Sequence, residues 1–344
     1  MKPLIEVKNL TVSYYTYAGE VQSVRGIDFE IPEGKTVSIV GESGCGKSVT
    51  AKSLMGLIEK PGKIKDESII CYKGKEITKY NEKQWEQFRG KEASMIFQDA
   101  LVSLNPTMSI GRQVCENLKN HFPEMSKEEK NTSAIAMLNQ IGIPDAAACM
   151  KKFPHELSGG MRQRVMIAMA MITKPELLIA DEPTTALDVT IQAQIIELMK
   201  KLQQQNGMSI LMITHDLGVV ADIADEIIVM YAGKIVEKGS CDDIFYHPEH
   251  PYTWALLKSV PRLDMPSDEK LATIAGSIPD MTKPPKGCAF CSRCPYAMNI
   301  CKDNMPGKTN VAKGHEVYCW LLDKRADRTG VPFGKEAIRE WQLN

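Results

Sequence analysis

The sequence predicts an α/β fold built around a phosphate-binding loop, and three observations support this class. An eight-residue stretch, Gly41-Glu-Ser-Gly-Cys-Gly-Lys-Ser48, has the form G-x-x-x-x-G-K-[ST]. Two later apolar runs, residues 177–182 and 209–215, both end in titratable side chains. Residues 166–239 alternate short apolar runs with helical patterns, as βαβ units do.

The phosphate-binding motif lies in the sequence context that it requires. Residues 4–98 are expected to alternate short apolar strands with one helix, and the motif falls between a strand at 36–40 and that helix at 47–58. Glycines let backbone N–H groups approach a triphosphate, and the helix start adds about half a positive charge. Lys47 reaches the phosphates, and Ser48 ligates Mg²⁺. A chance glycine-rich turn is the alternative, and the flanking strand and helix argue against it.

A second anion site is predicted at Leu157-Ser-Gly-Gly-Met161, which opens a helical stretch at 161–172. Ser158 is equally explained as an ordinary helix N-cap. The apolar runs that follow end at Asp181-Glu182 and at His215. Taken alone, these carboxylates indicate no more than a helix entry, and a lone histidine is more often structural than catalytic.

The remaining core elements follow from periodicity. Residues 99–165 are mostly helical and polar, with breaks at Pro106 and Pro144. A helix at 190–206 has apolar side chains on one face, contributed by Ile191, Ile195, Ile196, Leu198, Met199 and Leu202. Residues 226–238 predict a hairpin that turns at Ala232-Gly233.

In this order and over about residues 4–245, the motifs resemble those of ABC-type ATPases, the nucleotide-binding subunits of ATP-binding cassette transporters. The resemblance implies a P-loop NTPase fold, with a RecA-like core, an antiparallel β subdomain and a helical subdomain. It places the ATPase core at 1–98 and 166–245, and the helical subdomain with the Q-loop and signature motif at 99–165. Residues 246–344, here called the C-terminal extension, lie beyond it.

The resemblance also implies the roles of individual residues. Glu182 is the catalytic glutamate that orients water, and His215, Lys47 and Gln98 assist it. Ser48, Gln98 and Asp181 hold Mg²⁺. Tyr14 stacks on adenine, although Tyr15 and Tyr17 compete for that place. The other ATP-contacting positions are those of the Walker A loop, the signature motif and the D-loop: Gly41, Glu42, Ser43, Gly44, Cys45, Gly46, Lys47, Ser48 and Val49; Ser158, Gly159 and Gly160; and Asp188. Met161 replaces the commoner Gln of the signature motif.

Composition favours a reduced, intracellular setting. The chain has 344 residues with 42 basic and 43 acidic side chains, a net charge of −1 and no basic stripe, so nucleic-acid binding is not expected. The N-terminus lacks the apolar segment of a signal peptide. No apolar run approaches the roughly 18 residues that cross a bilayer, so membrane association is expected to come through a partner. The ten cysteines are expected to be reduced or bound to metal.

Five cysteines fall at residues 288–319, here called the cysteine-rich segment, and favour a metal centre. By spacing alone, Cys288, Cys291 and Cys294 form C-x-x-C-x-x-C, the start of a bacterial ferredoxin pattern. The segment also resembles the C-terminal extension of oligopeptide and dipeptide transporter ATPases. That resemblance implies a [4Fe-4S] cluster on Cys288, Cys294, Cys301 and Cys319, with Cys291 left as a spare ligand. Spacing alone leaves structural zinc open. The other cysteines are expected to be packing residues.

The resemblance implies an ATP-hydrolysing subunit for the import of di- and oligopeptides. Residues 178–194 are most like the first of two dissimilar ATPase subunits, which implies a head-to-tail heterodimer with a paralogue. Two permease subunits and a substrate-binding protein complete the assembly at the cytoplasmic face of the membrane, and residues 99–111 would contact the permease. Nickel or oligosaccharide import is an alternative, and a non-transport ATPase of DNA repair or translation is a more distant one. A further hypothesis makes the cluster a redox sensor.

Overall fold

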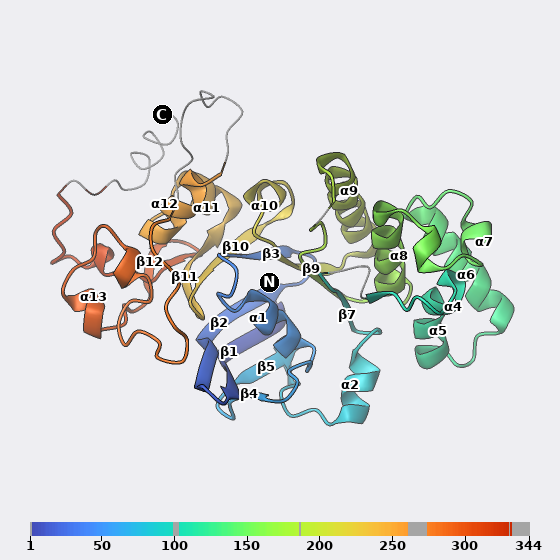
Figure 1. Cartoon of the computed structure of the whole chain (residues 1–344), viewed down its shortest axis with the longest axis horizontal. Coiled ribbons are helices and arrows are strands. Elements are labelled where there is room, and N and C mark those ends of the chain that lie inside the picture. Colours follow the sequence, from blue (N-terminus) through green and yellow to red (C-terminus); the bar gives the residue numbers. More distant parts are fainter. Residues whose placement is uncertain (1, 99–102, 186, 261–273, 330, 332–344) are drawn as a thin grey trace. The chain divides into compact units, whose positions relative to one another are not determined.

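The computed structural model describes residues 2–98, 103–185, 187–260, 274–329 and 331 (Figure 1). The chain divides into two compact units. The first unit comprises Met1–Ile5, Ile31–Thr36 and Tyr72–Ile213, and the second comprises Glu6–Glu30, Val37–Cys71 and Thr214–Asn344. Among the described residues, no helix combines the length and the apolar character needed to span a bilayer.

The first unit contains three parallel strands in the order β9-β8-β7. They are β7 (Ala93–Ile96), β8 (Leu177–Asp181) and β9 (Ser209–Ile213). Every residue of β8 and β9 is buried, which explains why their sequences are continuously apolar rather than alternating. Both strands end earlier than predicted, because Glu182 and His215 lie beyond the last paired residues, Asp181 and Ile213.

Helices make up the rest of the first unit. Their bounds are α2 (Glu82–Phe88), α4 (Ile110–Val114), α5 (Glu116–His121), α6 (Lys127–Gln140), α7 (Ala146–Cys149), α8 (Gly159–Met171) and α9 (Val189–Asn206), with a 3-10 turn η1 (Pro154–Glu156) and the short strand β6 (Lys75–Glu76). Helices α4 and α6 pack on α8, and α8 packs on β7 (Figure 1). Residues 99–165 are predicted to be mostly helical, and the structure confirms this for residues 103–165. Residues 99–102 lie outside the described residues.

Two helices of the first unit show which local signals set their bounds. Helix α9 begins one residue earlier than predicted because Asp188 caps it, accepting the Ile191 N–H at 2.9 Å, and Gly207 ends it at a φ of +64°. Helix α2 was not predicted. Its signal is the capping box of Asn81 and Gln84, whose side chains each accept the other residue's backbone N–H.

The central sheet of the second unit has the order β12-β13-β11-β10-β3. Its strands are β3 (Thr36–Val40), β10 (Glu226–Tyr231), β11 (Lys234–Ser240), β12 (Thr309–Ala312) and β13 (His315–Val317). Strand β10 is parallel to β3 and antiparallel to β11. The predicted hairpin is confirmed, and its turn residues Ala232 and Gly233 have φ values of +44° and +77°.

A second sheet in this unit differs from the short strands that were predicted. Strands β1 (Pro3–Thr16) and β2 (Gly19–Pro32) each have 14 residues, and they are joined by a tight turn. Strand β5 (Ile69–Tyr72) lies beside β1, and β4 (Gly62–Ile64) pairs antiparallel with β1 through Tyr14 and Gly62.

Helix α1 (Lys47–Leu54) is shorter than the predicted 47–58. The Met55 N–H bonds to the Lys52 carbonyl, a tightened last turn, and Gly56 then adopts a φ of +60°. A left-handed glycine directly after a helix ends it. The apolar residues beyond Gly56 therefore belong to the connection toward β4.

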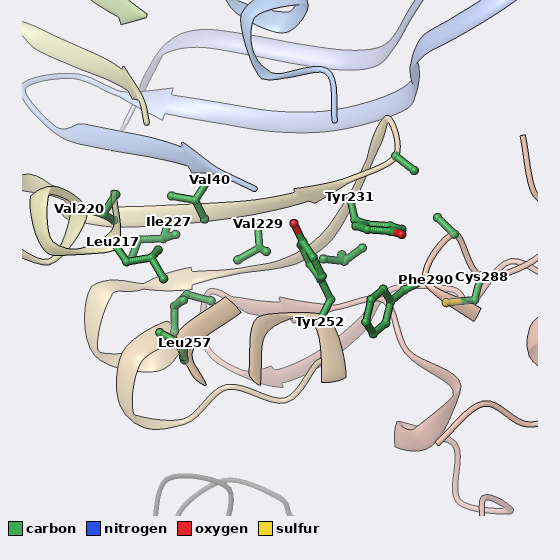
Figure 2. Packing of buried hydrophobic residues seen from close by; sticks show 14 of the residues in the cluster. Val40, Leu217, Val220, Ile227, Val229, Tyr231, Tyr252, Leu257, Cys288 and Phe290 are labelled. Atoms are coloured by element: carbon green, nitrogen blue, oxygen red, sulfur yellow. The ribbon is translucent and has the colours of Figure 1, made fainter. Parts of the chain in front are cut away.

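The C-terminal extension shares the core of the second unit, and its own apolar cluster around Trp254 and Leu321 is small, as its low apolar content predicts. The helices involved are α10 (Leu217–Ile223), α11 (Cys241–Tyr246), α12 (Pro251–Lys258) and α13 (Ile300–Asp303), with 3-10 turns η2 (Cys291–Arg293) and η3 (Trp320–Leu322). Tyr252 and Phe290 are fully buried against Tyr231 of β10 (Figure 2). Part of the proline-rich connection, residues 261–273, lies outside the described residues.

Candidate functional site

The phosphate-binding motif forms a tight loop between β3 and α1. Three of its glycines have positive φ values: +151° at Gly41, +79° at Gly44 and +105° at Gly46. A Cβ atom at Gly41 would lie 2.2 Å from the Met230 carbonyl oxygen, and one at Gly46 would lie 2.5 Å from the Ser23 carbonyl oxygen. Both positions therefore require glycine for the backbone to pass.

Lys47 is the buried cation of this loop. Its Nζ donates to the carbonyl oxygens of Gly41 at 2.7 Å and Glu42 at 3.0 Å, and the side chain is 5% exposed. The ammonium is thus held at the loop by neutral acceptors, which a phosphate oxygen can replace with a stronger, charge-assisted bond. Cys45, within the loop, is buried, and burial raises the pKa of its thiol, which fits the predicted packing role.

The two predicted carboxylates, Asp181 and Glu182, lie in the first unit, as Gln98 does. Asp181 is buried at the end of β8, and Glu182 follows it at a φ of +48°. Glu182 Oε2 accepts bonds from Gln98 Nε2 and Thr185 Oγ1, both at 2.9 Å. Two donors on one oxygen fix the orientation of the carboxylate.

The signature residues lie on an open surface of the first unit. Ser158 caps α8 by accepting the Met161 N–H at a long 3.4 Å, so the predicted N-cap is confirmed. Ser158 and Gly159 are exposed, and a Cβ atom at Gly159 would meet nothing within 4 Å. Gly160 instead faces Ile191 of α9, where a Cβ atom would lie 3.1 Å from Cγ2. The serine hydroxyl and the first helical N–H groups are therefore accessible.

The other predicted nucleotide contacts are distributed over both units. Asp188 is exposed and caps α9, whereas Ala186 of the D-loop lies outside the described residues. His215 is exposed just after β9, in the second unit with Lys47 and Ser48. Gln98, Asp181, Glu182 and the signature motif belong to the first unit.

The three candidate tyrosines for adenine stacking have different surroundings. Tyr14 is half-buried and lies against Gly62, where a Cβ atom would be 2.7 Å from the Tyr14 ring. Tyr15 is engaged with Lys65, whose Nζ donates to the Tyr15 hydroxyl at 2.6 Å. Tyr17 is fully exposed.

Four thiols of the cysteine-rich segment influence one another. Burial raises the pKa of Cys288 to about 12, with further contributions from Cys301 and Cys294, while a hydrogen bond from the Phe290 N–H opposes the rise. Burial likewise raises the pKa of Cys319, again with contributions from Cys288, Cys294 and Cys301. Cys291 also acts on Cys288 and Cys294, so all five cysteines of the segment share one partly buried neighbourhood.

A backbone hydrogen bond joins two of these cysteines, Cys288 and Cys301. The Cys288 N–H donates to the Cys301 carbonyl oxygen at 2.8 Å, and a Cβ atom at Gly287 would lie only 2.3 Å from that oxygen. Cys291 is partly exposed, as Cys294 and Cys319 are. Within the described part of the chain, no three His, Cys, Asp or Glu side chains are arranged to hold a metal ion.

Two residues of the second unit contact the phosphate loop without having been singled out for it. Arg293 pairs with the Glu42 carboxylate, and the Tyr252 hydroxyl accepts the Glu42 N–H at 2.8 Å. No local sequence signal links them to a loop more than 200 positions away.

Comparison with known proteins identifies the family. The chain matches the family model described as ABC transporter over residues 24–185, and the model described as oligopeptide/dipeptide transporter, C-terminal region, over residues 236–301. It is 50% identical over 327 residues to the dipeptide transport ATP-binding protein DppD of Bacillus subtilis, covering 95% of this chain and 97% of that protein. It is 52% identical to the oligopeptide transport ATP-binding protein OppD of the same organism, covering 98% and 93%.

A solved structure extends the likeness to the fold. A dimeric ATP-binding cassette, in a post-hydrolysis state with ADP and phosphate, superposes with a TM-score of 0.62 and 27% identity, covering 69% of this chain and 98% of that one. The predicted ABC-type P-loop NTPase fold is thereby confirmed. The chain belongs to the ABC transporter ATP-binding protein family, in the group that carries the oligopeptide/dipeptide transporter C-terminal region.

Proposed function

We propose that this chain is the ATP-hydrolysing subunit that powers the inward transport of di- and oligopeptides through an ABC permease. The observation that carries the proposal is the phosphate loop, in which glycines with positive φ bring the backbone around a buried Lys47 ammonium. The peptide cargo is supported by the names of the relatives, which match along nearly the whole chain.

The proposed chemistry assigns each polar group a distinct task. Glu182, held by Gln98 and Thr185, orients and polarises the attacking water. Lys47 and the loop amides offset charge on the phosphate oxygens, and His215 contacts the γ-phosphate.

The donors near this chemistry fit a magnesium ion. Ser48, Gln98 and Asp181 offer a hydroxyl, an amide and a carboxylate oxygen, the hard ligands that Mg²⁺ prefers. Because Gln98 Nε2 donates to Glu182, the amide oxygen of Gln98 is the atom assigned to the metal. The ion, when bound, neutralises charge on the phosphates.

ATP is proposed to lie between two subunits that pair head to tail, with Lys47 of one facing Ser158, Gly159 and Gly160 of the other. The open surface around Ser158 and the dimeric solved relative support this arrangement. The second subunit is assigned to a paralogue, and two permease chains and a substrate-binding protein complete the transporter at the cytoplasmic face of the membrane.

The cysteine-rich segment is proposed to hold a [4Fe-4S] cluster on Cys288, Cys294, Cys301 and Cys319, with zinc as the alternative. Support comes from the buried neighbourhood that these thiols share and from backbone N–H groups directed at the sulfurs of Cys288, Cys294 and Cys319. Four thiolates suit either metal centre. Iron, sulfide and zinc analysis of anaerobically purified protein separates the two. Cys294→Ser should lose the metal and Cys71→Ser should retain it, whereas metal retention in both variants would contradict the assignment.

The function is tested by isolating the tagged chain from membranes with its partners. We expect a second ATPase and two permease chains to co-purify, and peptides with the binding protein to stimulate ATP hydrolysis. Stimulation by nickel or an oligosaccharide instead would support the alternative cargo. An active ATPase that co-purifies with nucleic acid or ribosomes and no permease would contradict transport.

A further inference from the structure

Arg293, in the cysteine-rich segment, forms an ion pair with the second residue of the phosphate loop. Its Nη1 lies 2.6 Å from Glu42 Oε2, and its Nη2 lies 3.0 Å from Glu42 Oε1. The Arg293 side chain is only 3% exposed. A bidentate guanidinium–carboxylate pair fixes orientation as well as distance, and burial protects it from screening by water and salt. The loop is therefore attached to a segment 251 positions away in the sequence.

The remaining groups of Arg293 are also engaged, so the guanidinium is held independently of Glu42. Its Nε donates to the Ala275 carbonyl at 2.8 Å and its Nη2 to the Ile274 carbonyl at 2.9 Å. Its Nη1 lies 3.2 Å from the Tyr231 hydroxyl, and the guanidinium lies over the Tyr231 ring at 5.7 Å. An arginine held in this way imposes a position on its partner carboxylate, rather than adapting to it.

A second contact fixes the backbone at the same residue. The Glu42 N–H donates to the Tyr252 hydroxyl at 2.8 Å. The Tyr252 ring packs against Tyr231 at 4.6 Å and against Phe290 at 5.3 Å between centroids (Figure 2). Phe290 lies two residues after Cys288 and is fully buried. Both the side chain and the backbone of Glu42 thus depend on residues of the C-terminal extension.

We propose that the C-terminal extension positions the phosphate loop for ATP through Arg293, so that the conformation of the cysteine-rich segment and the affinity for ATP are coupled. The inference rests on the proposed function. Arg293 neutralises the Glu42 carboxylate beside a loop that receives a polyanion, and so fixes the side chain of the residue whose carbonyl accepts a bond from Lys47. Without Arg293, an unpaired carboxylate faces the incoming phosphates. Arg293 is a positioning residue and not a catalytic one.

ATP affinity measures this coupling directly. With Mg²⁺ and a non-hydrolysable ATP analogue, we expect Arg293→Met to weaken binding about tenfold, within the usual range for coupled sites. Arg293→Lys should not restore affinity, because an ammonium cannot form the bidentate pair. Arg325→Met is the matched control. It removes an arginine of the same extension whose exposed pair is with Asp323, and it should bind as the wild type does.

A second variant changes the loop residue of the ion pair, Glu42. In the Arg293→Met background, adding Glu42→Gln should cause no further loss, because the carboxylate that repels phosphate is then gone. The proposal is contradicted if folded Arg293→Met binds the analogue within twofold of wild type. It is equally contradicted if the two single losses multiply in the double variant. Should Arg293→Met fail to fold, analogue binding can be measured with Glu42→Gln alone, because this variant removes the same ion pair without altering the extension.

Coupling is reciprocal, so the nucleotide must also act on the extension. Amide hydrogen exchange of residues 287–301 should slow in wild type when the analogue is added, and should not respond in Glu42→Gln under nucleotide saturation. Exchange that ignores the nucleotide in wild type would overturn the inference. If the wild-type chain bound no nucleotide at all, the proposed function would fail. If the wild-type chain bound nucleotide and the variants bound it equally well, only the role of Arg293 would be refuted.

Discussion

At the scale of single residues, Glu182 is the residue to which we assign the activation of water. The residue has a positive φ, and its Oε2 accepts from both Gln98 and Thr185. A strained backbone that is stabilised by two directed bonds is typical of a functional position. These two bonds hold the carboxylate against Gln98 and Thr185.

Glu182→Gln tests this assignment. The amide keeps the shape but lacks the basicity that polarises water, so we expect ATP hydrolysis to fall by on the order of 100-fold or more. ATP binding should persist, because the loop and Lys47 are untouched. Phosphate release and equilibrium binding of ATP measure the two quantities separately. A variant that retains a quarter of the wild-type rate would contradict the role.

Residues also show where sequence reasoning succeeds and where it fails. The phosphate loop and the turn at Ala232-Gly233 were predicted because their signals are local, with glycine where positive φ is needed. The contact between Arg293 and Glu42 joins residues 251 positions apart, and no local pattern encodes it. Gln98 and Glu182 were predicted separately, and the structure supplies the 2.9 Å bond between them.

At the scale of secondary structure, periodicity predicted which segments are strands or helices better than it predicted their ends. Helix α1 ends near Gly56, inside an apolar stretch, because a left-handed glycine overrides the helical pattern. Strands β1 and β2 extend for 14 residues each, since pairing with each other satisfies their backbones beyond the apolar runs.

The N-terminus of α8 permits a test that separates capping from ATP binding. Ser158 caps α8 through a long 3.4 Å bond, whereas Ser126 caps α6 within a complete capping box at 3.2 Å. Ser158→Ala should cost less than about 1 kcal/mol of unfolding free energy and abolish ATP-dependent subunit pairing. Ser126→Ala is the control, and it should lose stability but keep pairing. Equal pairing in both variants, measured by cross-linking with the paralogue, would refute the signature role of Ser158.

The buried Glu237 of β11 makes the stability of the protein depend on pH through its neighbour Glu249. Burial and then the charge of Glu237 raise the pKa of Glu249 to about 7, although His315 and Arg328 oppose this. The pKa of Glu249 is thus higher in the folded state than in the unfolded state, where it is 4.5. Its contribution to the free energy of unfolding is therefore largest below pH 4.5, and is lost as pH rises through about 7. Glu249→Gln should therefore be more stable than wild type at pH 8.

The difference should shrink toward pH 5.5, where the folded Glu249 carboxyl is protonated. Thermal unfolding of variant and wild type at both pH values measures it. Glu316→Gln is the control, because the Glu316 carboxylate forms an exposed pair with Lys308, and its effect on unfolding should not depend on pH in this window. A stability difference between Glu249→Gln and wild type that stays constant from pH 5.5 to 8 would contradict the burial argument.

At the scale of the whole molecule, the account joins a nucleotide site to a transport cycle. One unit contains the phosphate loop. The other contains the Glu182 carboxylate, proposed to act in hydrolysis, and the open surface around Ser158. A ligand that binds one subunit arrangement more tightly than another shifts the population toward that arrangement. In the proposed cycle, ATP favours the closed pair of ATPases, and hydrolysis removes that preference and so alternates access through the permease.

The most direct test is uptake of a labelled tripeptide by proteoliposomes that contain the purified transporter, with ATP supplied on the ATPase side. The account predicts ATP-dependent uptake with the wild-type chain, none with Glu182→Gln, and wild-type uptake with Arg325→Met. Peptide uptake that proceeds equally with Glu182→Gln, or that needs no ATP, would contradict the claim that hydrolysis at this chain powers peptide import.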